Sequence, residues 1–141
     1  MTSVFDASVA IKCYVNEAGS DEARAAAAGP DPLVAPDFIL VEACNAAWKM
    51  VRKGEITVGH AERMLRAMPA LFGRLVPAAD IAPRALEIAQ QLDHPAYDCM
   101  YLALAEAEDA VLVSADTRFL RRVRQTEWEV RVRPLQTWPK D

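Results

Sequence analysis

The chain has 141 residues, of which 52% are hydrophobic and 26% are charged, and its formal net charge at pH 7 is −4. This length suits one domain, and the even spread of apolar residues with only 5 glycines excludes a fibrous or disordered protein. The mildly acidic balance argues against a protein that binds nucleic acid through general basicity, so any such contact must be local.

The cysteines and the N-terminus indicate a cytoplasmic protein. Cys13, Cys44 and Cys99 each occur singly in an apolar stretch, without the paired spacing of a disulfide framework or a zinc site. The first residues carry Asp6 and Lys12 within an apolar segment and lack the ~20 consecutive apolar residues that a membrane span needs. We therefore expect a reducing compartment and no membrane association.

Short apolar segments alternate along the chain with segments of helical periodicity. Strands are expected at residues 3–5, 33–35, 75–76 and 111–113, with an edge strand at 129–132. Helices are expected at residues 7–15, 21–28, 38–53, 57–72, 81–92, 95–108 and 117–125. Asp37 and Thr57 suit the N-caps of the third and fourth helices, and Gly54 suits the stop between them. Pro83 and Pro95 suit the openings of the fifth and sixth helices.

This alternation predicts the fold class. Short buried strands separated by helices favour a mainly parallel sheet with helices on both faces, which is a three-layer α/β/α domain covering residues 1–141. The helices on either side of residues 53–56 should form a helical hairpin. Because ligands of such sheets bind beyond the carboxyl ends of the strands, polar residues at those ends are the candidates for function.

Two acids follow predicted strands. Asp6 comes directly after the strand at 3–5, and Asp116 comes shortly after the strand at 111–113. Both should therefore stand at the carboxyl edge of the sheet. Each also has a simpler interpretation, because an Asp between a strand and a helix commonly caps the helix, which contributes about 1 kcal/mol.

Two further acids lie on helices that could border the same edge. Glu42 shares a helical stripe with Asn45 and Lys49 beside an apolar stripe, and its simpler interpretation is a solvated polar flank. Asp98 lies near the start of a helix, where the helix dipole favours an anion by roughly 0.3–1 kcal/mol. Its neighbours are aromatic or apolar, however, and a carboxylate in such surroundings needs a partner.

Taken together, the acids predict a metal site. Grouped carboxylates repel one another, and a divalent cation relieves the repulsion. Oxygen ligands without clustered His or Cys select Mg²⁺ or Mn²⁺ rather than zinc. Phosphodiester hydrolysis suits such an ion, and it needs no nucleophilic side chain. His60 and His94 are poor candidates for a catalytic triad, since His94 precedes Pro95 as a residue at the start of a helix.

Each acid lies in a short segment, and the segments occur in the order VFDASVA (4–10), VEACN (41–45), YDCMYLALA (97–105) and SADTRF (114–119). Their order and spacing resemble the PIN-domain ribonucleases, and within that family the VapC-type toxins of bacterial toxin–antitoxin pairs. The resemblance covers nearly the whole chain. It implies a PIN-like fold, an RNA substrate, an antitoxin partner and a homodimer.

The resemblance also implies roles for particular residues. Asp6, Glu42, Asp98 and Asp116 would be the catalytic residues and the ligands of Mg²⁺ or Mn²⁺. Ser8 and Ser114 would support the site through hydroxyl hydrogen bonds. Asn45, on the same helical stripe as Glu42, is a further candidate for a supporting residue. Members of the family often carry a further acid after the fourth segment, but here Thr117 follows Asp116, which leaves the number of metal ions open.

Two surfaces are candidates for RNA and protein contacts. Arg118, Arg121 and Arg122 concentrate positive charge near the fourth acid and could bind phosphate oxygens, although a solvated face balanced by nearby glutamates is an equal alternative. The hairpin carries more apolar residues than a thin sheet obviously needs, among them Trp48 and Met64. These could form a groove for an antitoxin helix or a dimer contact, with ordinary core packing as the stronger alternative.

Other functions fit the sequence less well. Aspartyl phosphatases need a second acid two residues after the first, where this chain has Ser8. A response-regulator receiver would need paired acids after the first strand and a Lys after a late one, and a nucleotide-binding module would need a glycine-rich phosphate loop. The main alternative is a non-catalytic PIN-like module that holds RNA or a protein without cleaving.

Overall fold

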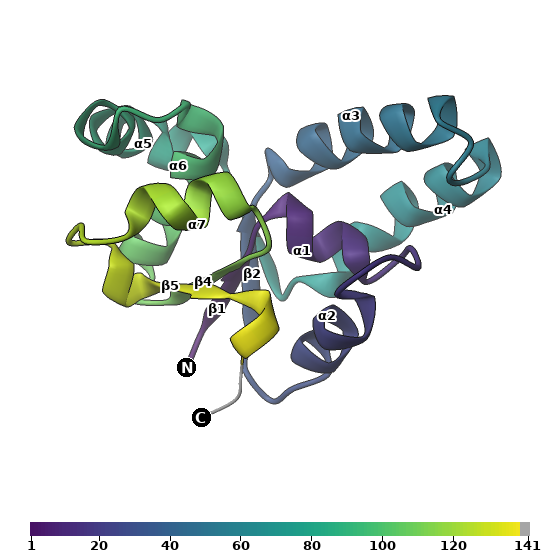
Figure 1. Ribbon diagram of the computed structural model, residues 1–141, viewed down its shortest axis with the longest axis horizontal. Coiled ribbons are helices and arrows are strands. Elements are labelled where there is room, and N and C mark those ends of the chain that lie inside the picture. The colour runs from purple at the N-terminus through teal and green to yellow at the C-terminus, as the bar shows by residue number, and fades with distance from the viewer. Residues whose placement is uncertain (139–141) are drawn as a thin grey trace.

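The computed structural model describes residues 1–138, which form one parallel sheet with helices on both sides (Figure 1). The five strands have the order β3-β2-β1-β4-β5. Their bounds are β1 (Ser3–Phe5), β2 (Leu33–Pro36), β3 (Arg74–Val76), β4 (Val111–Ser114) and β5 (Val132–Pro134). The predicted parallel sheet is thus confirmed. The edge strand begins later than predicted, because a 3₁₀ turn, η2 (Glu129–Arg131), occupies the start of the expected segment.

The helices complete the predicted three layers. They are α1 (Ala7–Lys12), α2 (Ser20–Ala27), α3 (Ile39–Arg52), α4 (Val58–Ala67), α5 (Ala78–Leu92), α6 (Ala96–Ala107) and α7 (Thr117–Val123), with 3₁₀ turns η1 (Met68–Leu71) and η3 (Leu135–Thr137). Figure 1 shows α5 and α6 on one side of the sheet and α1 and α2 on the other. The predicted hairpin is formed by α3 and α4, which project together from the sheet.

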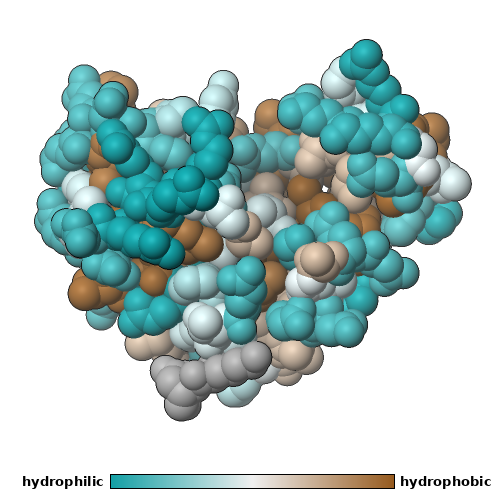
Figure 2. All heavy atoms as spheres, viewed as in Figure 1, coloured by the Kyte–Doolittle hydropathy of each residue, from teal (hydrophilic) through white to brown (hydrophobic). Residues whose placement is uncertain are grey.

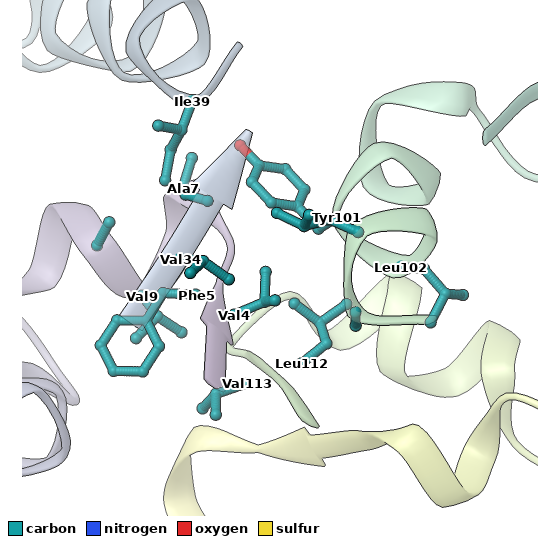
Figure 3. Packing of buried hydrophobic residues seen from close by; sticks show 14 of the residues in the cluster. Val4, Phe5, Ala7, Val9, Val34, Ile39, Tyr101, Leu102, Leu112 and Val113 are labelled. Atoms are coloured by element: carbon teal, nitrogen blue, oxygen red, sulfur yellow. The ribbon is translucent and has the colours of Figure 1, made fainter. Parts of the chain in front are cut away.

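The central strands carry the core. Val4 and Phe5 of β1 and Leu112 and Val113 of β4 are fully buried, as expected for strands covered on both faces (Figure 3). These two strands pair in register, with Val4 beside Leu112. From β1 the chain builds β2 and β3 on one side and returns to place β4 and β5 on the other. The carboxyl edge between β1 and β4 is therefore the switch point at which such sheets bind ligands.

Three helices begin or end three or more residues from the predicted position. α1 ends at Lys12 rather than 15, and the carbonyls of Cys13 and Val15, beyond its end, accept hydrogen bonds from the Arg24 guanidinium at 3.2 and 2.8 Å. α4 ends at Ala67, and the chain continues as a 3₁₀ turn that contains a proline. α5 begins at Ala78, so Pro83 lies inside the helix rather than at its opening.

Asp37 has a different role from the one predicted. It does not cap α3, whose N-cap residue is Phe38 in a helical conformation. Instead, Asp37 Oδ1 accepts a hydrogen bond from the backbone N–H of Ala78 at 3.0 Å, at the first residue of α5. The prediction that Asp37 accepts a hydrogen bond at a helix start is confirmed, but the helix is α5 and not α3. Thr57, in contrast, caps α4 as predicted, accepting from His60 N at 3.0 Å.

No helix within residues 1–138 is long and apolar enough to cross a membrane.

Candidate active site

The four predicted acids line one open pocket at the carboxyl edge of the sheet. Asp6 follows β1, Asp116 precedes α7, and Glu42 and Asp98 lie in the first turns of α3 and α6. The pocket has a volume of about 270 Å³, and Ser8, Asn45 and Lys49 are among its other lining residues. Figure 2 shows a hollow between the lobe that contains α5–α7 and the arm formed by α3 and α4.

Asp6 is the most buried of these acids, with 4% of its surface exposed. Its carboxylate accepts hydrogen bonds from Ser8 Oγ and Ser114 Oγ, each at 2.5 Å, and from Val9 N at 3.1 Å. The bond from Val9 caps α1, so the capping interpretation holds together with the place in the pocket. Burial raises the pKa of Asp6 to about 7, even though the three hydrogen bonds lower it, and repulsion from Asp98 adds to the rise.

Glu42 is held by a tyrosine from the other side of the pocket. Tyr101 Oη donates to Glu42 Oε1 at 2.5 Å, and the Tyr101 side chain is almost completely buried. In Figure 3 the Tyr101 hydroxyl points toward the arrowhead end of the sheet, near Ala7 and Ile39. Burial raises the pKa of Glu42, the bond from Tyr101 opposes this rise, and repulsion from the neighbouring acids adds to it.

Tyr101 was not predicted as a site residue. The sequence shows it only as one of the apolar and aromatic neighbours of Asp98. A usable signal was its spacing, because residues three apart on a helix share a face, so Tyr101 should point to the same side of α6 as Asp98.

Asp98 contacts a histidine at the start of its helix. His94 Nε2 lies 2.6 Å from Asp98 Oδ2. Burial raises the pKa of Asp98, the bond to His94 opposes this rise, and repulsion from Asp116 reinforces it. The chain was expected to use His94 only as a residue at the start of a helix, so this contact was missed.

Asp116 caps α7 as the simpler interpretation proposed. Its Oδ1 accepts from the backbone N–H groups of Arg118 and Phe119 at 2.9 and 3.2 Å. The same loop is tied to β1, since Ala115 N donates to Ser8 Oγ and Asp116 N donates to Ser114 Oγ, both at 3.1 Å. Ser8 and Ser114 thus join the Asp6 carboxylate to the loop that carries Asp116.

The donor chemistry of the pocket fits a hard divalent cation. All four acids offer carboxylate oxygens. Burial, and to a smaller extent repulsion among the acids, raises the pKa of three of them, and a cation would relieve the repulsion. Within residues 1–138, however, no three His, Cys, Asp or Glu side chains stand close enough together to hold an ion as placed. The acids therefore surround a pocket in which each is held by a protein donor, rather than a preformed ion cage.

The positive residues near the acids differ in how they lie relative to the pocket. Arg118 lies close enough to Asp98 to lower the pKa of that acid. Arg122 instead holds backbone, donating to Leu92 O at 2.5 Å and to Asp93 O at 3.2 Å. Arg121 lines a separate hollow of about 310 Å³ between α7 and β5. Lys49, which the sequence placed on a stripe with Glu42, lines the acidic pocket itself.

The apolar residues of the hairpin are mostly core. Met64, Met68 and Phe72 are buried, so the core-packing interpretation is correct for them. Trp48 is different, because 56% of its surface is exposed and the Arg52 guanidinium lies 5.3 Å from its ring centroid.

The hydrogen bond to Glu42 leads to a stability prediction. Replacing Tyr101 with Phe keeps the buried ring but removes the hydroxyl that donates to Glu42. We expect the free energy of unfolding to fall by about 1–2 kcal/mol, because Glu42 loses a hydrogen-bond donor. Tyr97→Phe is the matched control, because Tyr97 is 64% exposed and should change stability by less than about 0.5 kcal/mol. Urea unfolding in the presence of chelator measures both, and equal losses would show that the bond to Glu42 contributes nothing.

The sheet order and the acidic pocket together define an α/β/α domain whose candidate site lies at the carboxyl edge of the sheet, where such sheets commonly bind ligands. Comparison with known protein families identifies the family to which this domain belongs. The PIN domain family matches residues 3–125, and the chain belongs to this family.

Individual relatives agree with this membership. Ribonuclease VapC3 of Pyrobaculum aerophilum is 29% identical over 124 residues, which are 86% of this chain and 95% of that protein. Ribonuclease VapC1 of Mycobacterium tuberculosis is 35% identical over 86 residues, which are 60% of this chain and 62% of that protein.

Solved structures share the fold. The crystal structure of PAE2754 from Pyrobaculum aerophilum has a TM-score of 0.71 at 23% identity, and the match covers 97% of this chain and 85% of that chain. A toxin–antitoxin complex from Klebsiella pneumoniae has a TM-score of 0.68 at 18% identity and covers 94% of this chain and 97% of that chain. At these identities the likeness concerns the fold, and the predicted PIN-like architecture is confirmed.

Proposed function

We propose that the chain is a metal-dependent endoribonuclease and the toxin of a toxin–antitoxin pair. The observation that carries the proposal is the convergence of Asp6, Glu42, Asp98 and Asp116 from four separate elements on one pocket. The names of the relatives in the same family, which are VapC ribonucleases, support the activity.

The four acids are proposed as ligands of Mg²⁺ or Mn²⁺, with Ser8, Asn45 and Ser114 in support. When bound, such an ion polarises a phosphoryl oxygen and lowers the pKa of a bound water. The protein holds the carboxylates in place: Ser8 and Ser114 fix Asp6, and Tyr101 fixes Glu42. Since a water is the nucleophile, no activated side chain is required.

The RNA contacts are proposed on the positive residues beside the acids. Lys49 on α3 lines the pocket, and Arg118 on α7 lies near Asp98, so both offer cationic donors for phosphate oxygens of the RNA. Arg121 lies one turn further along α7 and lines a separate hollow, and Arg122 adds charge while it also holds the end of α5. The enzyme would act on cellular RNA in the cytoplasm.

The acidic pocket adjoins a second hollow between α1 and α3. Both are lined by Ser8, Ile11, Ala46 and Lys49. This second hollow of about 300 Å³ adds Lys12 and Lys53 to the lining, together with two glutamates. An RNA strand that enters the acidic pocket could therefore continue along α3 into a hollow lined by lysines.

Cleavage of RNA tests the proposal. We expect purified protein with Mn²⁺ or Mg²⁺ to cut total RNA into discrete products, and chelator to abolish the cutting. DNA of matched sequence serves as the control substrate and should stay intact. If no RNA pool is cut with either metal although the protein is folded, the non-catalytic PIN-like module becomes the better account.

The proposed partners are an antitoxin and a second copy of the chain. Solved neighbours of this fold include toxin–antitoxin complexes, which favours an antitoxin as the partner of this chain. A homodimer is a family-based proposal, and the exposed Trp48 on α3 is a candidate contact. Light scattering on the purified protein tests it, because a monomer has a mass of 15.5 kDa and a dimer twice that mass.

A further inference from the structure

The His94 side chain has one polar contact in the described part of the chain. Its Nε2 lies 2.6 Å from Asp98 Oδ2, and only 9% of the imidazole surface is exposed. An ionised Asp98 has no proton to give, so Nε2 must carry the proton and donate it to this bond. With Oδ2 taken by His94, Oδ1 is the oxygen left for a ligand in the pocket.

Packing of the ring and the conformation of the preceding residues also hold the imidazole in this position. The His94 ring packs against the ring of Phe119, which is fully buried, with ring centroids 5.5 Å apart. Arg122 donates to the carbonyls of Leu92 and Asp93, the residues before His94. Asp93 adopts a left-handed conformation with φ of 50°, which turns the chain out of α5. The histidine is thus fixed from its own loop and from α7.

The structural role of this position belongs to its backbone. His94 N donates to Ala89 O at 3.1 Å, which closes the end of α5, and any residue except proline can make that bond. The side chain is not needed for it. A buried imidazole whose polar contact is an acid of the pocket therefore points to a function at Asp98.

We propose that His94 is a positioning residue, which fixes Asp98 in the orientation that the metal ion requires. The inference rests on the proposed function, since it concerns the same pocket. Acids that bind metals are commonly oriented by hydrogen bonds from a second residue, and loss of such a bond weakens metal affinity by about 10–100-fold. Phe119 lies in the first turn of α7, and its backbone N–H donates to the N-cap Asp116. Because His94 packs against the Phe119 ring, it contacts the helix that carries Asp116 as well as the Asp98 carboxylate.

Two substitutions separate the hydrogen bond from the packing. His94→Leu keeps an apolar side chain against Phe119 but removes the donor, and we expect the dissociation constant for Mn²⁺ to rise about 10–100-fold. His94→Gln places an amide donor at a similar reach, and we expect it to restore Mn²⁺ affinity to within about threefold of wild type, a loss well below that range. Isothermal titration with Mn²⁺ measures both, and unfolding in chelator verifies that each variant is folded.

His60→Leu is the matched control. His60 Nε2 also makes a 2.6 Å contact, but with the backbone carbonyl of Tyr14, away from the acids, so its loss should leave Mn²⁺ affinity unchanged. The rate of RNA cleavage gives the second readout: His94→Leu should need more Mn²⁺ for half-maximal rate while the rate at saturating Mn²⁺ changes little.

The outcomes are distinguishable. If wild type binds Mn²⁺ and folded His94→Leu binds it equally well, the positioning role is wrong and the proposed function stands. If wild type binds no Mn²⁺ and cuts no RNA, the proposed function fails and the role of His94 fails with it.

Discussion

Replacing Asp98 with Asn should reduce metal-dependent RNA cleavage by roughly 10³-fold, which corresponds to about 4 kcal/mol of lost transition-state stabilisation. The amide keeps the size of the side chain and can still accept a bond from His94, but it removes one negative charge from the proposed metal ligands. The initial rate on a defined RNA at saturating Mn²⁺ measures the effect. Binding of Mn²⁺ should weaken in parallel.

Asp93→Asn is the matched control for this substitution. Asp93 lies in the same loop, its side chain is 97% exposed, and its ion pair with Arg122 at 3.5 Å is a surface contact of little energetic weight. Asn tolerates the left-handed conformation that Asp93 adopts, so the backbone should not change. This variant should cleave at the wild-type rate. Equal loss in both variants would mean that the acidic pocket is not where cleavage occurs.

Much of the fold could be predicted because the pattern of the sequence is local. The apolar strands and the helices between them require only the order of residues along the chain, and the parallel sheet follows from that alternation. Helix bounds were less predictable when a distant side chain decided them. Arg24 donates to the backbone carbonyls of Cys13 and Val15, just beyond the end of α1, and nothing in residues 7–15 shows this.

The acids could be predicted for the same reason, and their partners could not. Asp6 and Asp116 were placed by their positions after strands, which is a local signal. The hydrogen bond from Ser114 to Asp6 joins residues 108 positions apart, and the bond from Tyr101 to Glu42 joins residues 59 apart. Such pairs depend on how the strands and helices pack. Only the family resemblance indicated Ser8 and Ser114, and only the three-residue spacing from Asp98 on one helix indicated Tyr101.

Asp37 shows a limit of reading caps from sequence. A short acid before a helix predicts an N-cap for that helix, and here the acid serves the first residue of α5 instead. The backbone N–H groups at any helix start need acceptors, and the nearest acceptor in space is not always the nearest in sequence.

The burial of Asp6 makes the pocket costly when no cation is bound. An acid with 4% exposure and a pKa of about 7 resists ionisation near neutral pH, although hydrogen bonds from two serines favour the ionised form. Burial likewise raises the pKa of Glu42 and Asp98. The fold therefore retains acids that reduce its stability, which is the pattern expected where binding a cation is the function.

We expect the contribution of Asp6 to the stability of the metal-free protein to fall as the pH rises from about 4 to about 7. Below pH 3.8 both the folded and the unfolded states hold the Asp6 proton, so the raised pKa has no effect on stability. Between pH 3.8 and about 7 the unfolded state releases this proton while the folded state keeps it, so each increase in pH favours unfolding. A shift of about three pKa units lowers the free energy of unfolding by up to about 4 kcal/mol, and the loss is complete above pH 7.

Urea unfolding in chelator at a series of pH values measures this loss, and Asp6→Asn separates it from the rest of the protein. The amide does not ionise, so the variant should be more stable than wild type at pH 8 and should lose this advantage toward pH 4. Asp93→Asn, at an exposed acid, should follow the wild-type curve. Adding Mn²⁺ at pH 8 should stabilise wild type far more than Asp6→Asn, because the ion binds the deprotonated acid. If Asp6→Asn showed no stability advantage over wild type at pH 8, the cost of burying an ionised Asp6 would be contradicted.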